Sequence, residues 1–314
     1  MNQTMRAIVQ TELGGPEVLT VADVPRPSPA PDEVLVRVRA AGVNPVDAGA
    51  RAVGVFIGRP PFTVGWDVSG VVEEVGLGVT RLSVGDEVFG MPRFPNPAGG
   101  YGQYVTAPSR HFARKPASLS HVEAAGLPLV GLTAWQALVD TADVRPGQRV
   151  LVHAAAGGLG HIAVQIAKSL GAHVIGTASA AKHDFVRSLG ADELIDYTSV
   201  DFTTAVEDVD VVVNSLSGEY VARSAAVLRR GGMVVNLKSA DADAMPPEAV
   251  EREARMAFML VEPDLRGLEE LSRLVDGGEL SIHVAETFDL EHAADAHRAI
   301  ETGRTKGKIV LTVD

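Results

Sequence analysis

Residues 155–160 read AAGGLG and place Gly157 and Gly160 three positions apart, directly after an apolar run. That run, VLVHA at residues 150–154, predicts a strand, and the apolar residues after Gly160 recur at helical spacing. Glycine at position 157 lets the backbone approach a pyrophosphate, and glycine at position 160 lets strand and helix pack closely. N–H groups at the start of the helix attract the anion. The segment therefore predicts a dinucleotide-binding turn with alanine at its first glycine position, and a merely tight turn is the alternative.

The residues after the second predicted strand bear on the choice of dinucleotide. In NAD-binding sites an acidic residue about 20 positions beyond the turn usually binds the ribose 2′-hydroxyl. Ala178 holds that place, and Ser179 and Lys182 follow it. A hydroxyl and a cation suit a 2′-phosphate, so we expect NADPH rather than NADH. The alternative for Lys182 is a solvated charge at the start of a helix.

The chain contains no cysteine, which excludes disulfides, thiolate catalysis, iron–sulfur clusters and every zinc site that uses cysteine. Among the nine histidines no HExxH segment occurs, and His292 and His297 lie five positions apart, off a common helix face. We therefore expect the histidines to pack in the core or lie on the surface, and we expect no metal site.

Length and charge limit the class of protein. A chain of 314 residues exceeds the size of one hydrophobic core, so we expect two domains. The 28 Lys and Arg residues against 40 Asp and Glu give a net charge of −12, which repels nucleic acid and anionic membranes. No signal peptide and no apolar stretch of about 20 residues is visible. We expect a cytoplasmic protein with neither a nucleic-acid nor a membrane partner.

The pattern of apolar and polar residues changes near Pro128. Before it, short runs such as residues 34–38 and 70–75 alternate apolar and polar positions, which is typical of a partly open β-barrel. After it, strand-like runs alternate with helical ones, which predicts a parallel sheet. A helical stretch at residues 291–301 and a strand-like run at 308–313 close the chain, and we expect this tail to return to the first domain. The strand-like runs of the second part are at residues 149–153, 173–177, 194–196, 209–213 and 233–237.

Several segments together resemble the zinc-independent quinone oxidoreductases, a branch of the medium-chain dehydrogenase/reductase superfamily. They are GGPEVL at 14–19, AAGVNPVD at 40–47, GYGQY at 100–104, LPLVGLTA at 127–134 and GKIVL at 307–311. The resemblance covers nearly the whole chain and implies an α/β protein in which a GroES-like, partly open β-barrel forms the catalytic domain and a Rossmann parallel sheet binds NADP(H). It places these domains at 1–125, 126–265 and 266–314, the last completing the first. It also implies a homodimer formed by extension of the Rossmann sheet.

The resemblance carries over a set of catalytic residues. It implies that Asn44 and Thr133 approach the nicotinamide and that Asp47 orients Asn44 or caps a helix, while ordinary turn and cap chemistry is the alternative for Asn44 and Asp47. Some relatives have a tyrosine shortly afterwards, but residues 48–51 read AGAR. Tyr101, Tyr104 and solvent remain the candidate proton donors. The zinc-dependent relatives use a cysteine and a Gly-His-Glu segment, where this chain has residues 44–47 and Gly65-Trp66-Asp67, so a catalytic zinc is not expected.

Two further sets of residues complete the expected site, one for the cofactor and one for the acceptor. The acceptor set is aromatic and apolar and would hold a flat molecule, and ordinary core packing is the alternative for each of its residues. The residues expected to bind the cofactor are Ala156, Gly157, Gly158, Leu159, Gly160, Ser179, Lys182, Tyr197, Asn214, Leu237, Lys238, Ser239 and Lys308, and those expected to line the acceptor pocket are Phe56, Phe62, Trp66, Met91 and Phe94.

With neither a Lewis acid nor a serine hydrolase elbow, the remaining chemistry is hydride transfer from NADPH to an electrophilic acceptor. A quinone or the activated C=C bond of an enone, enal or enoyl thioester fits this requirement. One alternative is a non-catalytic NADPH-binding protein with a structural or regulatory role. Another, a zinc alcohol dehydrogenase, would need tightly bound metal.

Overall fold

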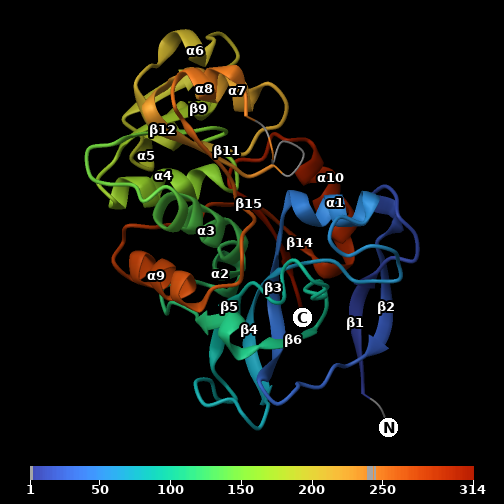
Figure 1. Cartoon of the computed structure of the whole chain (residues 1–314). Coiled ribbons are helices and arrows are strands. Elements are labelled where there is room, and N and C mark those ends of the chain that lie inside the picture. Colours follow the sequence, from blue (N-terminus) through green and yellow to red (C-terminus); the bar gives the residue numbers. More distant parts are fainter. Residues whose placement is uncertain (1–2, 239–242, 244) are drawn as a thin grey trace. The chain divides into compact units, whose positions relative to one another are not determined.

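The structure, a computed structural model, describes residues 3–238, 243 and 245–314 and divides into two units (Figure 1). Unit 1 comprises Met1–Leu132, Glu262–Gly278 and Ile282–Asp314. Unit 2 comprises Thr133–Val261 and Glu279–Ser281. Unit 1 is therefore assembled from both ends of the chain, whereas unit 2 is nearly one continuous segment.

Unit 1 is organised by the long strand β3 (Glu33–Val43), which is buried along almost all of its length. One edge of β3 pairs with β4 (Asp67–Val75), and the other is shared by β6 (Tyr104–Pro108) and β15 (Lys308–Thr312), all antiparallel. A late strand thus lies beside an early one (Figure 1). The sheet order is β14-β15-β3-β4-β5-β7, with β6 on β3. The other elements are β1 (Thr4–Val9) paired with β2 (Thr20–Pro25), β5 (Glu87–Gly90), β7 (Phe112–Arg114), β14 (Val284–Asp289), helices α1 (Pro45–Val53), α2 (His121–Ala125), α9 (Leu265–Asp276) and α10 (Ala293–Glu301), and 3-10 turns η1 (Pro16–Val18), η2 (Ser109–His111) and η6 (Leu290–His292).

Helix α1 begins directly after β3, and its start is fixed by local sequence. Asn44 is the N-cap and Pro45 occupies the first turn, where a missing N–H carries no penalty. The Asp47 carboxylate accepts the Asn44 N–H at 2.7 Å, as in a capping box. Gly54 ends the helix in the left-handed conformation at φ 74°. These caps place Asn44 and Asp47 at the carboxyl end of β3.

Unit 2 is a six-stranded sheet in the order β10-β9-β8-β11-β12-β13, and every pairing is parallel. Counted from β8, this is the order 3-2-1-4-5-6 of a Rossmann sheet. The parallel sheet expected from the sequence is thus confirmed. Its strands are β8 (Arg149–Val152), β9 (His173–Ala178), β10 (Glu193–Asp196), β11 (Val209–Asn214), β12 (Leu228–Asn236) and β13 (Arg255–Phe258), and its helices are α4 (Gly160–Ser169), α5 (His183–Ser188), α6 (Phe202–Ala205), α7 (Tyr220–Ala226) and α8 (Pro247–Glu251), with the 3-10 turn η4 (Ala180–Lys182) before α5. Helix α3 (Pro128–Trp135) and the π-helix η3 (Gln136–Thr141) lead into it.

Apolar side chains at the centres of these strands form the core of unit 2. Leu151, Ile175, Val212 and Val234 come from β8, β9, β11 and β12, and all four are fully buried. Strands buried on both faces need near-continuous apolar runs, which is the pattern of this part of the sequence. The carboxyl ends of the strands are thereby held in fixed positions.

Two glycines of unit 1 give a matched test of this packing. A Cβ on Gly42 in β3 would lie 2.4 Å from the Ala125 carbonyl oxygen and 2.9 Å from the Asp67 Cβ, whereas one on Gly49 in α1 would lie 3.6 Å from Val55 Cγ2. We expect Gly42→Ala to lower the free energy of unfolding by roughly 1–3 kcal/mol through overpacking. Gly49→Ala should raise it by about 0.5–1 kcal/mol, because alanine favours a helix interior. Urea denaturation of both variants checks this, and equal effects would contradict the packing described for Gly42.

Candidate functional site

Three strand ends meet in unit 1. β3 pairs with β4 so that Gly42 lies opposite Asp67, and with β15 so that Val43 lies opposite Ile309. Asn44 follows β3 and Lys308 begins β15. This register, which depends on pairings far apart in the sequence, brings the side chains of Asn44, Asp67 and Lys308 together.

The Asn44 amide is bonded on both sides. Its Nδ2 donates to Asp67 Oδ2 at 2.8 Å, and its Oδ1 accepts a short hydrogen bond from Lys308 Nζ. Asn44 is 1% exposed. Because the amide is occupied within unit 1, Asn44 is held in one orientation.

Lys308 and Asp67 form a buried ion pair around this amide. The Lys308 Nζ lies 3.4 Å from Asp67 Oδ2 and also donates to the Val43 carbonyl oxygen at 3.3 Å, while Asp67 Oδ1 accepts the Leu129 N–H at 2.6 Å. Burial raises the pKa of Asp67 and lowers that of Lys308, and the attraction between the two charges opposes both shifts. A buried pair is tolerated when its remaining donors and acceptors are bonded, as they are here. The cofactor role expected for Lys308 stays a prediction, since its ammonium is directed into this cluster.

Asp47 extends the cluster and carries a buried oxygen with no partner. Its Oδ2 accepts the Asn44 N–H at 2.7 Å and the Tyr101 hydroxyl at 3.2 Å, whereas Oδ1 has no hydrogen-bond partner among the described residues. Burial, to which the Asp67 carboxylate adds, raises the pKa of Asp47 to about 7 against the opposing effect of the Asn44 N–H. Asp47 therefore holds a proton over part of the neutral range, and Oδ1 is the oxygen free to carry it.

A chain of side chains with a fixed hydrogen-bond direction ends at Asp47. Arg51 Nη1 lies 3.4 Å from His297 Nδ1, and because a guanidinium only donates, Nδ1 must accept. His297 Nε2 then carries the proton and donates to the Tyr101 oxygen at 3.2 Å, and Tyr101 donates to Asp47. Burial, with the Arg51 charge adding to it, lowers the pKa of His297 to about 3, so the ring is neutral. Arg51 is held in turn by Glu301 at 2.5 Å.

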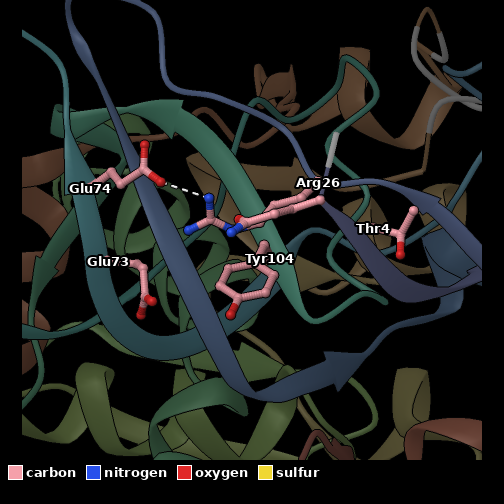
Figure 2. Close-up of a pocket in the computed structure, with 6 residues that line it drawn as sticks. Thr4, Arg26, Glu73, Glu74 and Tyr104 are labelled. Carbon is pink, nitrogen blue, oxygen red and sulfur yellow. Dashed lines mark hydrogen bonds and ion pairs between the residues drawn. The ribbon is translucent and has the colours of Figure 1, made fainter. Parts of the chain in front are cut away.

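The two candidate tyrosines lie in different places. Tyr101 is fully buried in the cluster just described. Tyr104 lies opposite Arg37 on β3, seven residues before Asn44, or roughly 20 Å along the strand. Tyr104 lines a polar surface hollow together with Arg26 and Glu74 (Figure 2). The hollow has a volume of about 480 Å³, and Arg26 lies 4.6 Å from the centre of the Tyr104 ring and donates to Glu74 at 2.6 Å. The hollow is lined by Gln3, Thr4, Arg26, Glu73, Glu74 and Tyr104. Only Tyr101 belongs to the cluster around Asn44.

Three of the expected acceptor residues are in edge-to-face contact. The ring of Phe94 lies 5.5 Å from that of Phe56 and 5.3 Å from that of Trp66. Phe94, Trp66 and Met91 are buried, Phe62 is half-buried, and Phe56 is exposed. The structure thus brings a group of aromatic side chains together in unit 1, and binding of an acceptor to them stays a prediction.

In unit 2 the glycine-rich turn directly follows β8. The Gly157 N–H donates to the Ala154 carbonyl oxygen at 2.9 Å, and α4 begins at Gly160. A Cβ on Gly160 would lie 2.3 Å from the Ala154 oxygen, so glycine is needed there for the fold. Among the described residues, a Cβ on Gly157 would meet a single atom within 4 Å, the same oxygen at 3.2 Å. The space beside Gly157 is therefore open to a ligand.

This turn lies at the point where the strand order reverses. β8 and β11 are neighbours in the sheet, and the carboxyl end of β11 carries the buried Asn214. Ligands of such sheets bind beyond the carboxyl ends of the strands at this switch point. Asn214 Nδ2 donates to the Leu216 carbonyl oxygen at 2.9 Å and to Asn236 Oδ1 at 3.3 Å. Asn236 was not among the expected residues, although both asparagines end runs of valine in the sequence.

Ala178 ends β9, and the turn that follows it holds the two residues expected to select the cofactor. Ser179 precedes η4 and Lys182 ends it, and both are half-buried. Asp196 lies opposite Ala178 at the end of β10 and accepts from the Thr198 N–H at 3.0 Å and its hydroxyl at 2.7 Å, which lowers the pKa of Asp196. This acid is a neighbour of the turn that the sequence pattern did not single out.

The remaining expected residues are distributed over unit 2. Thr133 is buried in α3, Tyr197 is exposed after β10, and Leu237 and Lys238 are half-buried after β12. Ser239 lies outside the described residues. Ala156, Gly158 and Leu159 lie in the turn itself, between β8 and α4.

Sequence reasoning missed Arg51 and His297 of the buried chain. They lie 246 positions apart, and nothing local to either residue indicates the contact. The near-complete burial of a charged arginine is evident only from the packing of α1 and α10 in unit 1.

Two known families match this chain. Residues 30–117 match the alcohol dehydrogenase GroES-like domain, and residues 189–311 match the family described as zinc-binding dehydrogenase. The GroES-like domain expected from the sequence is thus confirmed.

Among curated proteins, the chain is 37% identical to a 2-haloacrylate reductase of Burkholderia sp. over 98% of each chain. The chain is also 41% identical, over 90% of its length, to the polyketide synthase GfsB of Streptomyces halstedii. It spans 5% of the length of that synthase.

Several solved structures have the same fold as this chain over nearly its full length. The quinone oxidoreductase from Coxiella burnetii gives a TM-score of 0.94 at 36% identity, covering 99% of this chain and 100% of that one. The CurK enoyl reductase gives 0.90 at 30%, with the same coverage, and Escherichia coli quinone oxidoreductase complexed with NADPH gives 0.87 at 28%, covering 98% and 99%. On this similarity in sequence and fold, the chain belongs to the medium-chain dehydrogenase/reductase superfamily, in its quinone oxidoreductase-like branch.

Proposed function

We propose that this chain is an NADPH-dependent oxidoreductase that transfers hydride to a quinone or to the activated C=C bond of an α,β-unsaturated carbonyl compound. The observation that carries the proposal is the open space beside Gly157, at the switch point of a Rossmann sheet and at the start of α4. The Escherichia coli quinone oxidoreductase complexed with NADPH supports the identity of the cofactor.

The residues of unit 2 fit such a cofactor. The backbone of residues 156–160 would hold the pyrophosphate, and Ser179 and Lys182 would hold the 2′-phosphate, with Asp196 kept in place by its bonds to Thr198. Bound NADPH supplies a hydride from its nicotinamide ring. The protein contributes binding and orientation, and these decide how often the reacting atoms meet.

The class of acceptor is proposed from the relatives and from the aromatic group of unit 1. A 2-haloacrylate reductase and the CurK enoyl reductase are named for reduction of activated C=C bonds, and other relatives are named for quinones. The contact of Phe94 with Phe56 and Trp66 offers flat apolar surfaces for either acceptor.

We assign Asp47 to the orientation of Asn44 rather than to direct proton transfer. Asp47 and the Tyr101 hydroxyl are both fully buried, and Asp47 accepts the Asn44 N–H while Asp67 and Lys308 hold the Asn44 amide. The proton that accompanies the hydride then comes from solvent, which balances the reduction.

We further propose that the reaction needs no zinc. The family described as zinc-binding dehydrogenase implies a metal, but the Asn44 amide and the Asp67 carboxylate bind the Lys308 ammonium, which puts a positive charge among the atoms that a metal would use. Over the part of the chain that the structure describes, no three His, Asp or Glu side chains are grouped to hold a metal. This donor set does not fit Zn²⁺.

One observation favours a second candidate, a non-catalytic NADPH-binding protein. Asp47 and the Tyr101 hydroxyl, two groups near Asn44 that could give up a proton, are both shielded from solvent. A protein with this role would bind NADPH and leave it unoxidised in the presence of acceptors.

The proposal includes a homodimer and a cytoplasmic location. β13 is an edge strand of the parallel sheet, and Phe258 and Leu260 are each 39% exposed at its end. Pairing of two β13 edges would cover them. Among the described residues, no helix is both long enough and apolar enough to cross a bilayer.

We expect the purified protein to oxidise NADPH only when a quinone, enal, enone or enoyl thioester is added, and to keep this activity after exhaustive chelation. A spectrophotometric acceptor panel, run before and after 1,10-phenanthroline, checks both points. Tight NADPH binding without acceptor-dependent oxidation would favour the non-catalytic candidate. Activity lost on chelation and restored by Zn²⁺ alone would contradict the zinc-free proposal.

Lys182→Ala should lower kcat/KM for NADPH by about 10- to 100-fold, because a charge-assisted hydrogen bond contributes roughly 1.5–3 kcal/mol. NADH has no 2′-phosphate, so its kinetics should not change. The measurement is kcat/KM for both cofactors at fixed ionic strength. Arg187→Ala on α5 is the control, since it removes the same charge from an exposed side chain paired with Asp184. An equal loss for both cofactors would assign Lys182 to the fold.

Asp47→Asn tests the raised pKa of the buried acid. Between about pH 4 and 7 the unfolded chain releases this proton while the folded chain keeps it, so the free energy of unfolding of the wild type falls as the pH rises. Asparagine does not titrate, so the stability of the variant relative to wild type should rise across this window, by up to about 1.4 kcal/mol per pH unit. Urea denaturation at several pH values measures it. Asp201→Asn is the opposite case, because hydrogen bonds from Thr203 and Arg223 lower the pKa of Asp201 to about 2. Below about pH 4 the wild type loses stability as the pH falls, so the stability of Asp201→Asn relative to wild type should fall as the pH rises through this range. Parallel pH profiles for wild type and Asp47→Asn would contradict the assignment.

A further inference from the structure

The turn beside Gly157 depends on a residue in an unfavourable conformation. Ala154 has φ 50°, in the left-handed region that residues with a Cβ rarely adopt. Its carbonyl oxygen accepts the Gly157 N–H at 2.9 Å and is the atom nearest to the open space at Gly157. The conformation of Ala154 therefore sets the shape of the space that the cofactor's pyrophosphate would enter.

A buried hydroxyl holds Ala154 from the neighbouring strand. The Ala154 N–H donates to the Thr177 Oγ1 of β9 at 3.1 Å, and the Ala155 N–H donates to the Thr177 carbonyl oxygen at 2.9 Å. Thr177 is 3% exposed, so water cannot readily replace its hydroxyl. One residue of β9 thus holds the turn through both its side chain and its backbone.

His153 connects this hydroxyl to helix α7. Its Nδ1 lies 3.3 Å from Thr177 Oγ1, and its Nε2 lies 3.0 Å from the hydroxyl of Ser224. All three side chains are buried. Whichever ring nitrogen carries the proton, the imidazole joins both hydroxyls, and α7 follows the loop that begins at Asn214.

The ring of His153 is also fixed by packing. It makes edge contacts with Phe202 at 4.8 Å and Tyr220 at 5.5 Å, and Arg223 lies over those two rings. Burial, with the Arg223 charge adding to it, lowers the pKa of His153 to about 3, so the ring is neutral. A neutral, immobilised imidazole is suited to positioning and unsuited to acid catalysis.

We propose that Thr177 and His153 are positioning residues for cofactor binding, which hold the Ala154 peptide so that the turn accepts a pyrophosphate. The proposal rests on the proposed use of NADPH. It adds the buried residues behind the turn that fix the shape of the pyrophosphate site. It predicts that losing the Thr177 hydroxyl impairs recognition of the pyrophosphate and leaves the rest of the dinucleotide site unchanged.

The test compares Thr177→Val, which keeps the shape of the side chain, with Thr177→Ser, which keeps the hydroxyl. The dissociation constant for NADPH should rise about tenfold in Thr177→Val, equivalent to about 1.4 kcal/mol for one buried hydrogen bond, and stay near wild type in Thr177→Ser. Adenosine 2′-phosphate, which lacks the pyrophosphate, should bind wild type and both variants equally. Hydrogen exchange of the Ala154 amide in the free protein should be faster in Thr177→Val alone.

A double variant tests the route through Ala154. Glycine tolerates a positive φ, so Ala154→Gly should reduce the loss that Thr177→Val causes, giving a non-additive pair. Equal weakening of NADPH and adenosine 2′-phosphate, or strictly additive effects, would overturn the positioning role in favour of a general effect on folding. Unchanged NADPH affinity in Thr177→Val would overturn it as well. Failure of the wild type to bind NADPH would instead overturn the proposed function, and this inference with it.

Discussion

The burial of one ammonium group, that of Lys308, ties together three strand ends of unit 1. Lys308 is 2% exposed, and a charge removed from water in this way needs acceptors placed around it. The acceptors are the Val43 carbonyl oxygen, the Asn44 amide and the Asp67 carboxylate, which come from β3, the start of α1 and β4. Their positions require the register of β3 with both of its neighbours. A shift of that register would move the ammonium away from these acceptors, so the polar cluster and the sheet register support each other.

Both units use a buried neutral histidine beside an arginine to join elements. In unit 1 His297 lies between Arg51 and Tyr101, and in unit 2 His153 lies between two hydroxyls with Arg223 nearby. Burial and the neighbouring positive charge keep each imidazole uncharged, so each ring has one donor and one acceptor to offer. Such a ring joins two polar groups without adding a charge to the core. Both histidines are buried in the core, in line with the expectation that histidines pack there or lie on the surface, and each also joins polar groups, which that expectation did not include.

The sequence predicted those features that depend on neighbouring residues. The parallel sheet and the glycine turn follow from apolar runs and glycine spacing within a few tens of residues. The hydrogen-bonded chain from Arg51 to Asp47 was not predictable, because its members lie on α1, α10 and a loop, and their contacts depend on how distant segments pack. Asn236 and Asp196 are intermediate cases. Each ends a strand of the observed sheet, and each lies opposite an expected site residue or its neighbour on an adjacent strand, Asn214 for Asn236 and Ala178 for Asp196.

The discontinuous make-up of unit 1 has a consequence for synthesis. Asp67 and Lys308 are 241 residues apart, and at about 5–20 residues per second a ribosome needs roughly 10 to 50 s to make the chain between them. During that interval Asp67 lacks its native partner Lys308, and the stretch of β3 that will bind β15 is an open strand edge. Unit 2, nearly continuous in sequence, has all of its strands before β15 exists. All strands of the nucleotide-binding sheet are therefore made before the first unit can be completed, and slower translation lengthens the time during which the open strand edge is exposed to aggregation or chaperone capture.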